Sequence, residues 1–511
     1  MHEHTVRATT GSGIVEGFVR NGVNRWRSIP YARPPVGALR FRAPQPPQPW
    51  RGVRYCHGFA NCAPQQRRYT MLGVGKYQPM GEDCLTLNVV TPQWSGPEPD
   101  HEPLPVMFFI HGGGYLMGSS ATPLYDGAAL ARRGCVYVSV NYRLGALGCV
   151  DLSSLSTPNT PIDSNLFLRD LVMALRWVRE NIGAFGGDPG NVTIFGESAG
   201  AHAVATLLAV PEAEGLFAQA ISESPASGLV SGPQTAATIA AKFATLLGAT
   251  GDDAAETVMH ARPRDLVGAL DTLLTQSLTD MDGAFSLGPT YGDDVLPDDP
   301  VVAMRRGAAH KVPLIVGTNA DEGKLFTRFM KLLPTTEPAI ERLLAAAEPE
   351  ARQRITAAYP GYPRAAACVQ LGGDFAFGTA AWQIAEAHSP HAPTYVYRYD
   401  YAPRTLHWSG LGATHATELL AVFDIYRTRF GSALTAAMDR RSALRVSRDV
   451  QNRWRDFGRT GVPGEGWPRY TEPERPVLVF DRRTRVDYDP HPHRREAWAG
   501  FSLASRSPDQ P

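Results

Sequence analysis

The sequence has no hydrophobic run long enough to cross a membrane and no excess of charge of either sign. Its apolar runs, such as 106–110 and 136–140, have the length of strands, far below the roughly 20 residues that a membrane-spanning helix needs. The 50 Lys and Arg residues balance 50 Asp and Glu residues. Because a neutral chain has no electrostatic attraction for polyanions, we expect no nucleic acid as a partner and no membrane span.

Metal-ligand patterns and a secretory signal are also missing. The 6 Cys and 14 His residues show none of the spacings typical of metal sites, so we expect neither a metal nor another cofactor. Residues 1–5 are polar, whereas a secretory signal needs an apolar stretch near the N-terminus. The sequence as it stands therefore predicts a cytoplasmic protein. It predicts nothing about the oligomeric state.

The segment 192–200, V-T-I-F-G-E-S-A-G, predicts a strand, a sharp turn and a helix, with Ser198 at the tip of the turn. Such a turn forces a strained backbone on the residue at its tip, so Gly196 and Gly200 must lack side chains that would clash. The turn lifts the serine hydroxyl clear of the sheet. It also places the next backbone N–H groups at a helix N-terminus, where negative charge is favoured. We therefore interpret Ser198 as a nucleophile.

A glycine-rich turn follows the buried strand predicted at 106–110. Residues 111–115 read H-G-G-G-Y, and three successive glycines let backbone N–H groups approach a ligand closely. In isolation this pattern is equally typical of a flexible loop. Beside a nucleophile turn it predicts the second half of an oxyanion hole, the first half being the N–H of the residue after the serine.

Strand patterns alternate with helical patterns along the chain. Apolar residues recur at 3- and 4-residue spacing over 165–182, which predicts an amphipathic helix. Further strands are predicted at 135–141, 218–222, 312–317 and 394–399. This alternation favours an α/β protein with a mostly parallel central sheet and helices on both faces. We interpret the helical patterns at about 228–310 and 327–390 as insertions into a single domain, 1–511.

Two segments have no clear periodicity. Residues 28–41 contain clustered prolines, and composition alone favours a stiff surface linker there. Residues 454–498 mix turn residues with short stretches of strand character, so they predict a tail of turns and short strands.

A serine nucleophile needs a base to take its proton and an anion to orient that base. On this type of fold the acid and then the histidine follow the serine in the chain. His415 closes a small-residue loop next to a predicted helix, 417–423, where its ring could point into a site. Asp321 and Glu322 lie in an acidic loop after the strand predicted at 312–317, and the residues alone leave the choice between them open.

Eight motifs occur in order from about residue 11 to 498. They are S-I-P-Y-A-R-P-P-V-G-A-L-R-F (28–41), G-E-D-C-L-T-L-N-V (81–89), H-G-G-G-Y (111–115), N-Y-R-L-G (141–145), F-G-G-D-P (185–189), G-E-S-A-G (196–200), G-T-N-A-D-E-G (317–323) and G-A-T-H-A-T-E-L (412–419). In these motifs the chain resembles the type B carboxylesterases, the cholinesterase-like branch of the α/β hydrolases. The resemblance implies the α/β-hydrolase fold, and it makes 28–41 a family motif rather than a linker.

The resemblance also implies a serine carboxylesterase that needs no metal or cofactor. Ser198 corresponds to the nucleophile, His415 to the general base, and Glu322 to the carboxylate that orients the histidine. The serine attacks the ester carbonyl, and water then releases the acyl group from the enzyme. The expected oxyanion-hole donors are the backbone N–H groups of Gly113, Gly114 and Ala199.

Further positions take their roles from the same resemblance. Ser224 matches the serine behind the acid, Glu418 matches the buried glutamate after the histidine, and Glu197 is placed with them around the triad. Cys62 and Cys84 match the first disulfide of the family. A cytoplasmic location would argue for reduced thiols instead.

The sequence departs from the family pattern close to these positions. Glu223 and Pro225 stand where the family usually has Gln and Gly, and Ala416 stands where Gly usually follows the histidine. None of these changes removes a group that carries out the chemistry.

The loop 63–83 bears on the substrate. In cholinesterases the corresponding loop carries a Trp whose face binds a quaternary ammonium. Here the loop contains Tyr69 and Tyr77 but no Trp, and the chain has no net charge to attract cations. We therefore expect small uncharged esters as substrates. The alternatives are a thioesterase, lactonase or amidase with the same triad, or a non-catalytic binding or adhesion protein of the same fold.

Overall fold

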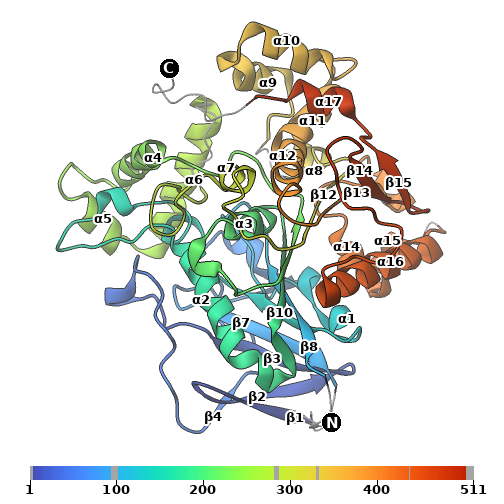
Figure 1. The fold of residues 1–511 in the computed structure, drawn as a ribbon. Helices are drawn as coiled ribbons and strands as arrows, with labels where there is room; N and C mark the ends of the chain where they lie inside the picture. Colours follow the sequence, from blue (N-terminus) through green and yellow to red (C-terminus); the bar gives the residue numbers. More distant parts are fainter. Residues whose placement is uncertain (1–3, 94–101, 281–286, 330–332, 437, 502–511) are drawn as a thin grey trace.

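The computed structural model describes residues 4–93, 102–280, 287–329, 333–436 and 438–501. In this part of the chain 13 strands form one sheet (Figure 1). Their order is β1-β2-β3-β7-β9-β8-β10-β11-β12-β13-β14-β15, with β4 beside β2. The strands of the sheet are β1 (Thr5–Thr10), β2 (Gly13–Arg20), β3 (Val23–Pro30), β4 (Val53–Tyr55), β7 (Thr86–Pro92), β8 (Leu104–Ile110), β9 (Val136–Val140), β10 (Gly187–Glu197), β11 (Gln219–Glu223), β12 (Leu314–Asn319), β13 (Thr394–Tyr399), β14 (Pro476–Phe480) and β15 (Arg485–Tyr488). A separate hairpin consists of β5 (Met71–Gly73) and β6 (Lys76–Tyr77).

The middle of the sheet is parallel. Strands β9, β8, β10, β11, β12, β13 and β14 each run parallel to the next, whereas β1, β2, β3 and β7 pair antiparallel and β15 returns antiparallel to β14. Parallel strands are covered on both faces, so their sequences are continuously apolar. In β8, Phe108 and Ile110 enter one core cluster, while Met107 and Phe109 enter the cluster on the opposite face. The prediction of a mostly parallel, two-sided sheet is confirmed.

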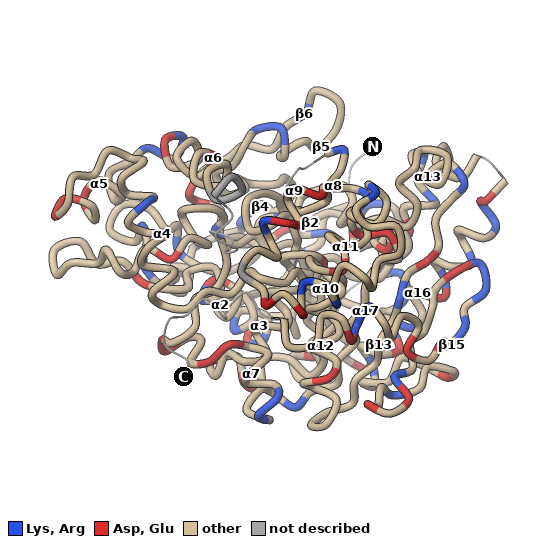
Figure 2. The backbone as a smooth tube through the Cα atoms, turned by 90° about the horizontal axis from the view of Figure 1, so that it is seen from above, with Lys and Arg blue, Asp and Glu red and all other residues tan. Residues whose placement is uncertain are grey.

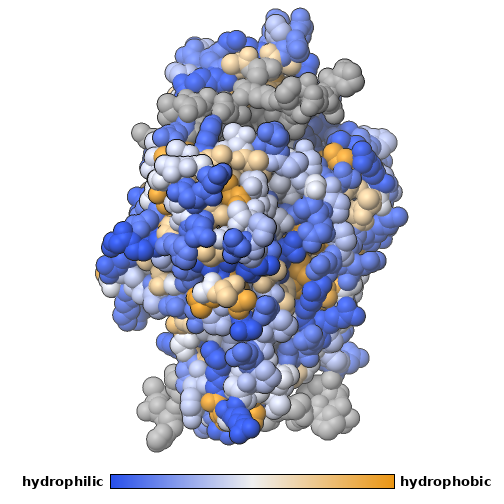
Figure 3. Space-filling view, turned by 90° about the vertical axis from the view of Figure 1, so that its left-hand side faces the viewer, coloured by the Kyte–Doolittle hydropathy of each residue, from blue (hydrophilic) through white to orange (hydrophobic). Residues whose placement is uncertain are grey.

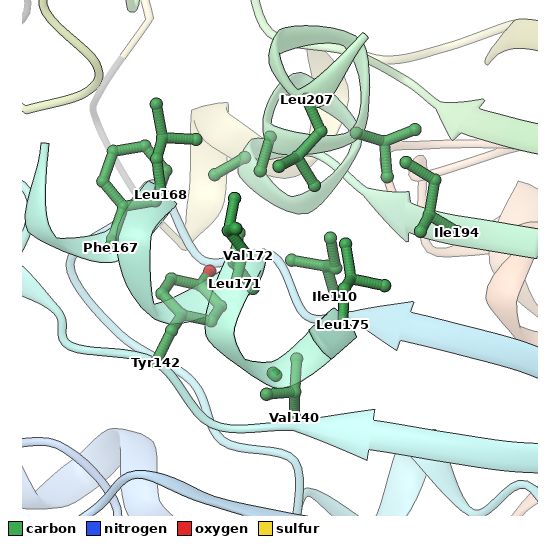
Figure 4. Close-up of a cluster of buried hydrophobic side chains, with 14 of the residues drawn as sticks. Ile110, Val140, Tyr142, Phe167, Leu168, Leu171, Val172, Leu175, Ile194 and Leu207 are labelled. Atoms are coloured by element: carbon green, nitrogen blue, oxygen red, sulfur yellow. The ribbon is translucent and has the colours of Figure 1, made fainter. Parts of the chain in front are cut away.

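Helices α2 (Leu166–Asn181) and α3 (Ala199–Leu207) cover one face of the sheet. The apolar side chains of α2 repeat at 3- and 4-residue spacing, as predicted for 165–182, and pack against the strands. Figure 4 shows Leu168, Leu171, Val172 and Leu175 of α2 in one cluster with Ile110, Val140 and Ile194 of the strands and Leu207 of α3. The opposite face is covered by α14 (Leu419–Val422) and α16 (Arg440–Thr460).

Of the remaining helices, α1 lies between β8 and β9 in the chain, and the others follow β11. They are α1 (Ala128–Ala131), α4 (Pro233–Leu246), α5 (Ala254–His260), α6 (Pro263–Asp280), α7 (Pro300–Arg305), α8 (Lys324–Arg328), α9 (Glu337–Leu343), α10 (Pro349–Ala357), α11 (Ala365–Gly373), α12 (Thr379–His388), α13 (Arg404–Trp408), α15 (Arg429–Leu434) and α17 (Pro492–Ala497). Helices α4 to α7 fall in the first predicted insertion, 228–310, of which residues 281–286 lie outside the described residues. Helices α9 to α12 fall in the second, 327–390.

Composition alone was wrong about 28–41. The segment begins as the end of β3, and Tyr31 and Phe41 are buried in the main core cluster. The Tyr31 hydroxyl donates to the carbonyl oxygen of Asn141 at 2.7 Å. Prolines make this segment extended, but its aromatic residues make it part of the core.

The tail prediction is also wrong in its first part. Helix α16 extends to Thr460, so 454–460 is helical rather than a mixture of turns and strands. Val446, Val450, Trp454 and Phe457 of this helix are buried against the sheet. Their 3- and 4-residue spacing is helical, but many arginines separate them. The strands predicted in the rest of the tail are present as β14 and β15.

Charges of both signs are spread along the chain (Figure 2), as expected for a formal net charge of zero. On the face in Figure 3, hydrophobic residues lie in small groups among hydrophilic ones. Among the helices of the described residues, none is both long enough and apolar enough to cross a membrane.

Candidate active site

Ser198 occupies the turn between β10 and α3. Its backbone has φ 61° and ψ −124°, a conformation that residues other than glycine rarely adopt. The residues on either side, Glu197 and Ala199, are buried, whereas Ser198 itself is half-buried. Within the described part of the chain its hydroxyl group makes no hydrogen bond. The strained turn therefore presents the serine side chain at an accessible point.

The glycines beside the serine are required by close backbone contact. A Cβ atom on Gly196 would lie 2.6 Å from the carbonyl oxygen of Ile110, and one on Gly200 would lie 2.1 Å from the same oxygen. Real Cβ atoms do not approach so closely. The turn at Ser198 is thus packed directly on the end of β8.

The glycine loop that follows β8 lies against this turn. A Cβ atom on Gly112 would be 2.4 Å from the carbonyl oxygen of Glu197 and 3.0 Å from the Cβ atom of Ser198. The next two residues, Gly113 and Gly114, have φ of 117° and 61° and are half-buried. Their backbone N–H groups therefore belong to a half-buried loop beside the serine, where the family resemblance predicts two oxyanion-hole donors.

His415 and Glu322 are joined by a short hydrogen bond. The Nδ1 atom of His415 lies 2.6 Å from Oε2 of Glu322, and both side chains are buried. The other oxygen of Glu322 accepts from the Ser224 hydroxyl at 2.6 Å and from the Asn319 backbone N–H at 2.7 Å. These donors fix the carboxylate, which in turn fixes the orientation of the imidazole ring.

Asp321 points elsewhere. Its carboxylate forms an ion pair with Lys324 at 2.9 Å and accepts from the backbone N–H of Ala413 at 3.2 Å. Its own N–H donates to the carbonyl oxygen of Ala413 at 2.9 Å. Asp321 therefore anchors the loop that carries His415 but forms no hydrogen bond with the histidine ring.

The second ring nitrogen of His415 faces Glu197. Its Nε2 atom lies 3.0 Å from Oε1 of Glu197, at an angle that makes the contact an ion pair rather than an aligned hydrogen bond. Burial lowers the pKa of His415, but the Glu197 and Glu322 carboxylates outweigh burial and raise the pKa well above its ordinary value. The resting ring is therefore held between two carboxylates and favours its protonated form.

Two further buried carboxyls lie behind the histidine. Burial raises the pKa of Glu223 to about 8, although the Trp454 indole N–H donates to this carboxyl at 2.6 Å and opposes the shift. Burial and the nearby carboxylates, Glu197 among them, also raise the pKa of Glu418 well above its ordinary value. Asn319 Nδ2 donates to Glu418 at 2.5 Å. A pKa raised to about 8 favours the uncharged form of Glu223 at neutral pH, and the Gln that usually occupies this position in the family is uncharged as well.

Ala416 has φ 65°, in the left-handed region. This conformation costs a residue with a Cβ atom roughly 1–2 kcal/mol, and the family usually has Gly here. The replacement of Gly by Ala at position 416 therefore leaves a strained backbone conformation next to His415. Pro225 is buried, and nothing in the structure explains its replacement of Gly.

Two aromatic residues that sequence reasoning missed pack on the histidine. Phe377 stacks on the His415 ring with centroids 4.1 Å apart, and Phe326 lies at 5.2 Å in a tilted arrangement. Phe377 comes from a π-helical turn, Asp374–Gly378, between α11 and α12. Single π turns often occur at functional sites. No sequence signal marks this turn beyond a Gly-Gly-Asp preceding two phenylalanines.

Cys62 and Cys84 are both free and buried in the structure. Burial raises the pKa of both thiols. A hydrogen bond from the Gly81 N–H to the carbonyl oxygen of Cys62 closes the loop 62–81, and Cys84 follows three residues later. Whether they form a disulfide in oxidised protein stays a prediction. In the described part of the chain no three His, Cys, Asp or Glu side chains form a group that could hold a metal ion.

Comparison with known proteins gives a consistent picture. The sequence matches the carboxylesterase family over residues 3–498. It is 37% identical to para-nitrobenzyl esterase of Bacillus subtilis (strain 168), covering 96% of this chain and 97% of the relative. It is 36% identical to fumonisin B1 esterase of Sphingopyxis macrogoltabida, covering 90% and 84%.

Solved structures agree with the sequence comparisons. A PNB esterase structure superposes with a TM-score of 0.85 at 34% identity, covering 97% of this chain and 99% of that one. A thermophilic PNB esterase gives 0.83 at 33% identity, covering 97% and 100%. The α/β-hydrolase fold implied by the motifs is confirmed. The chain belongs to the carboxylesterase family and is a carboxylic ester hydrolase.

Proposed function

We propose that the chain hydrolyses uncharged carboxylic esters through an acyl-enzyme on Ser198, with His415 as general base and acid and Glu322 as the carboxylate that orients it. The observation that carries this proposal is the 2.6 Å hydrogen bond between His415 Nδ1 and Glu322, on a histidine whose Nε2 atom faces the residue beside Ser198. This constellation lies at the carboxyl ends of the parallel strands, where sites of open α/β sheets are found.

The steps follow from the chemistry of these groups. His415 takes the Ser198 proton at Nε2 as the hydroxyl oxygen attacks the ester carbonyl carbon, and Glu322 stabilises the imidazolium that forms. The alcohol leaves with a proton from His415. Water then attacks the acyl-enzyme by the same route and releases the acid.

The backbone N–H groups of Gly113, Gly114 and Ala199 are the proposed donors to the oxyanion. The support is their placement, because the first two belong to the half-buried loop beside Ser198 and the third begins α3. Donors aimed at the developing charge commonly contribute about 10²–10³ in kcat each. Ser224, Glu418 and Glu197 support the triad through the contacts described above.

The whole chain, 1–511, is proposed to act as one domain. The support is the continuous order of the sheet from β1 to β15. In addition, Ser198, Glu322 and His415 come from widely separated parts of the chain.

A stoichiometric inhibitor tests this proposal directly. An organophosphate ester should react with one group per chain, and Ser198→Ala should abolish the reaction. A pre-steady-state burst of p-nitrophenol from p-nitrophenyl butyrate should count the same number of sites. A chain that neither reacts nor gives a burst would be the non-catalytic alternative. A thioesterase, lactonase or amidase would instead show the burst but a higher kcat/KM for its own substrate class.

The ion pair between Glu197 and His415 predicts the pH dependence. Since the base must be neutral to accept a proton, kcat/KM should rise with pH through an apparent pKa above the ordinary histidine value of 6.5. Removing an opposite charge lowers a histidine pKa, so Glu197→Gln should move this limb to lower pH by about 1 unit or more. The measurement is kcat/KM for p-nitrophenyl butyrate from about pH 5 to 9.

The control for this profile is Glu212→Gln, which removes an exposed carboxylate paired with Arg176 and should leave the limb in place. If the apparent pKa of the kcat/KM profile is unchanged or higher in Glu197→Gln, then Glu197 does not stabilise the protonated form of His415.

The loop 63–83 predicts discrimination against cationic esters. The faces of Tyr69 and Tyr77 are already covered by the guanidinium groups of Arg68 and Arg67, at 4.7 Å and 4.5 Å from the ring centroids. A quaternary ammonium would therefore find one face of each tyrosine already occupied and would meet two positive charges. We expect kcat/KM for butyrylcholine to be lower than for an uncharged butyrate ester of similar leaving-group pKa, such as 2-methoxyethyl butyrate. A higher value for butyrylcholine would contradict this substrate class.

A further inference from the structure

A hydrogen bond links the glycine loop to the nucleophile helix. The hydroxyl group of Tyr115, the last residue of the loop 111–115, lies 2.8 Å from Nδ1 of His202 in α3. Tyr115 is fully buried, and its backbone has φ 59°, a strained value for a residue with a side chain. The strain indicates that the surrounding contacts hold this residue in place.

His202 is itself tied to the nucleophile. Its backbone N–H donates to the carbonyl oxygen of Ser198 at 2.9 Å, in the first turn of α3. Its side chain is 8% exposed, and burial lowers its pKa to about 4, so the ring is neutral at neutral pH. The bond to Tyr115 is therefore one between two neutral groups, and it spans from the glycine loop to the helix that begins beside Ser198.

The proposed oxyanion hole is built from two pieces of chain that need such a link. Gly113 and Gly114 belong to the loop after β8, whereas Ala199 belongs to α3. The two loop glycines have no side chains with which to fix themselves. Their nearest side chain toward the C-terminus is that of Tyr115, which reaches α3. Donors to an oxyanion must be placed to within a fraction of an ångström, because a misplacement of about 1 Å can cost roughly 10²-fold in rate.

We propose that His202 is a positioning residue. Through its hydrogen bond to Tyr115 it holds the backbone N–H groups of Gly113 and Gly114 at a fixed position relative to the N–H group of Ala199. This inference rests on the proposed function, because it assigns His202 a task in the same oxyanion hole. His202 contacts no reacting atom, and its effect is carried by the loop.

The test compares Tyr115→Phe, His202→Phe and the double variant with the wild type. Each change removes the same hydrogen bond, so each should lower kcat and kcat/KM for p-nitrophenyl butyrate by about 10-fold or more, with KM within about twofold. The double variant should be no worse than the poorer single variant. Affinity for an aryl trifluoromethyl ketone, whose serine adduct places an oxyanion in the hole, should fall by the same factor as kcat/KM.

His202→Asn serves as the rescue variant, because the asparagine amide carries a polar atom as many bonds from Cα as Nδ1 of histidine. It should recover activity relative to His202→Phe. Thr206→Val is the matched control, since it removes a buried hydrogen bond from the Thr206 hydroxyl to the His202 carbonyl in the same helix without touching Tyr115. It should leave kcat per active site unchanged.

Counting active sites by the p-nitrophenol burst separates the possible results. A wild type that neither reacts with an organophosphate ester nor hydrolyses p-nitrophenyl butyrate would refute the proposed function itself. A normal burst with unchanged kcat in Tyr115→Phe would overturn only the role of His202. If His202→Phe does not fold, Tyr115→Phe, which removes a single oxygen atom, still decides the question. Equal losses in Thr206→Val and Tyr115→Phe would show a general helix effect and would also overturn the role.

Discussion

Ser198→Ala is expected to lower kcat for p-nitrophenyl butyrate by about 10⁴- to 10⁶-fold while KM changes little. The alanine side chain cannot form the acyl-enzyme, and the remaining rate would come from the oxyanion hole and substrate binding alone. His415→Ala should have a loss of similar size, because the serine hydroxyl is a weak nucleophile without a base. The Ser198→Ala/His415→Ala double variant should be no slower than either single variant, since the two residues act as one unit.

The matched control for this experiment is Ser222→Ala. Ser222 is a buried serine of β11 whose hydroxyl donates to the carbonyl oxygen of Ala201 in α3 at 2.9 Å. Loss of this hydrogen bond in Ser222→Ala should lower the free energy of unfolding by about 1 kcal/mol. The kcat per active site should stay within a few-fold of the wild-type value. A correctly folded Ser198→Ala variant that keeps more than about 0.01% of wild-type kcat, the activity left by the smallest expected loss of about 10⁴-fold, would mean that another residue is the nucleophile.

The strands and helices whose residues follow a clear hydrophobic pattern could be predicted from the sequence. Val106 to Ile110 is continuously apolar because β8 is covered on both faces, and the helical spacing in 165–182 matches α2. The pattern in α16 was equally present, with buried side chains at Val446, Val450, Trp454 and Phe457. Its many arginines lower the mean hydropathy of the helix without altering this stripe, so the helix could have been predicted from spacing alone.

Some residues of the candidate site could also be predicted from local sequence patterns, and others could not. The turn at Ser198 and the loop at 111–115 have local signatures, because strain and close backbone approach require glycine at particular positions. Phe377 has no such signature. It lies in a π turn and stacks on His415, but its sequence neighbours resemble those of any buried helix. Contacts of this kind depend on how distant elements pack, which single-sequence patterns do not contain.

Asp321 and Glu322 show what the sequence leaves open and why. They are adjacent acids in one loop, and composition or spacing does not distinguish them. The structure separates them by direction: Glu322 faces His415, Ser224 and the Asn319 N–H, whereas Asp321 faces Lys324. The two carboxylates are therefore expected to respond very differently to loss of charge.

Glu322→Gln is expected to lower kcat by about 10⁴-fold, because a neutral amide 2.6 Å from Nδ1 cannot stabilise the imidazolium and can hold the ring in the wrong tautomer. Asp321→Asn should lower kcat less than about 10-fold. It removes an ion pair on a side chain that is 29% exposed, and such pairs contribute about 0–1 kcal/mol. Thermal unfolding should show a small loss of stability for Asp321→Asn, while burst titration of both variants reports kcat per intact site. A crippled Asp321→Asn beside a nearly normal Glu322→Gln would mean that Asp321, and not Glu322, orients the histidine during turnover.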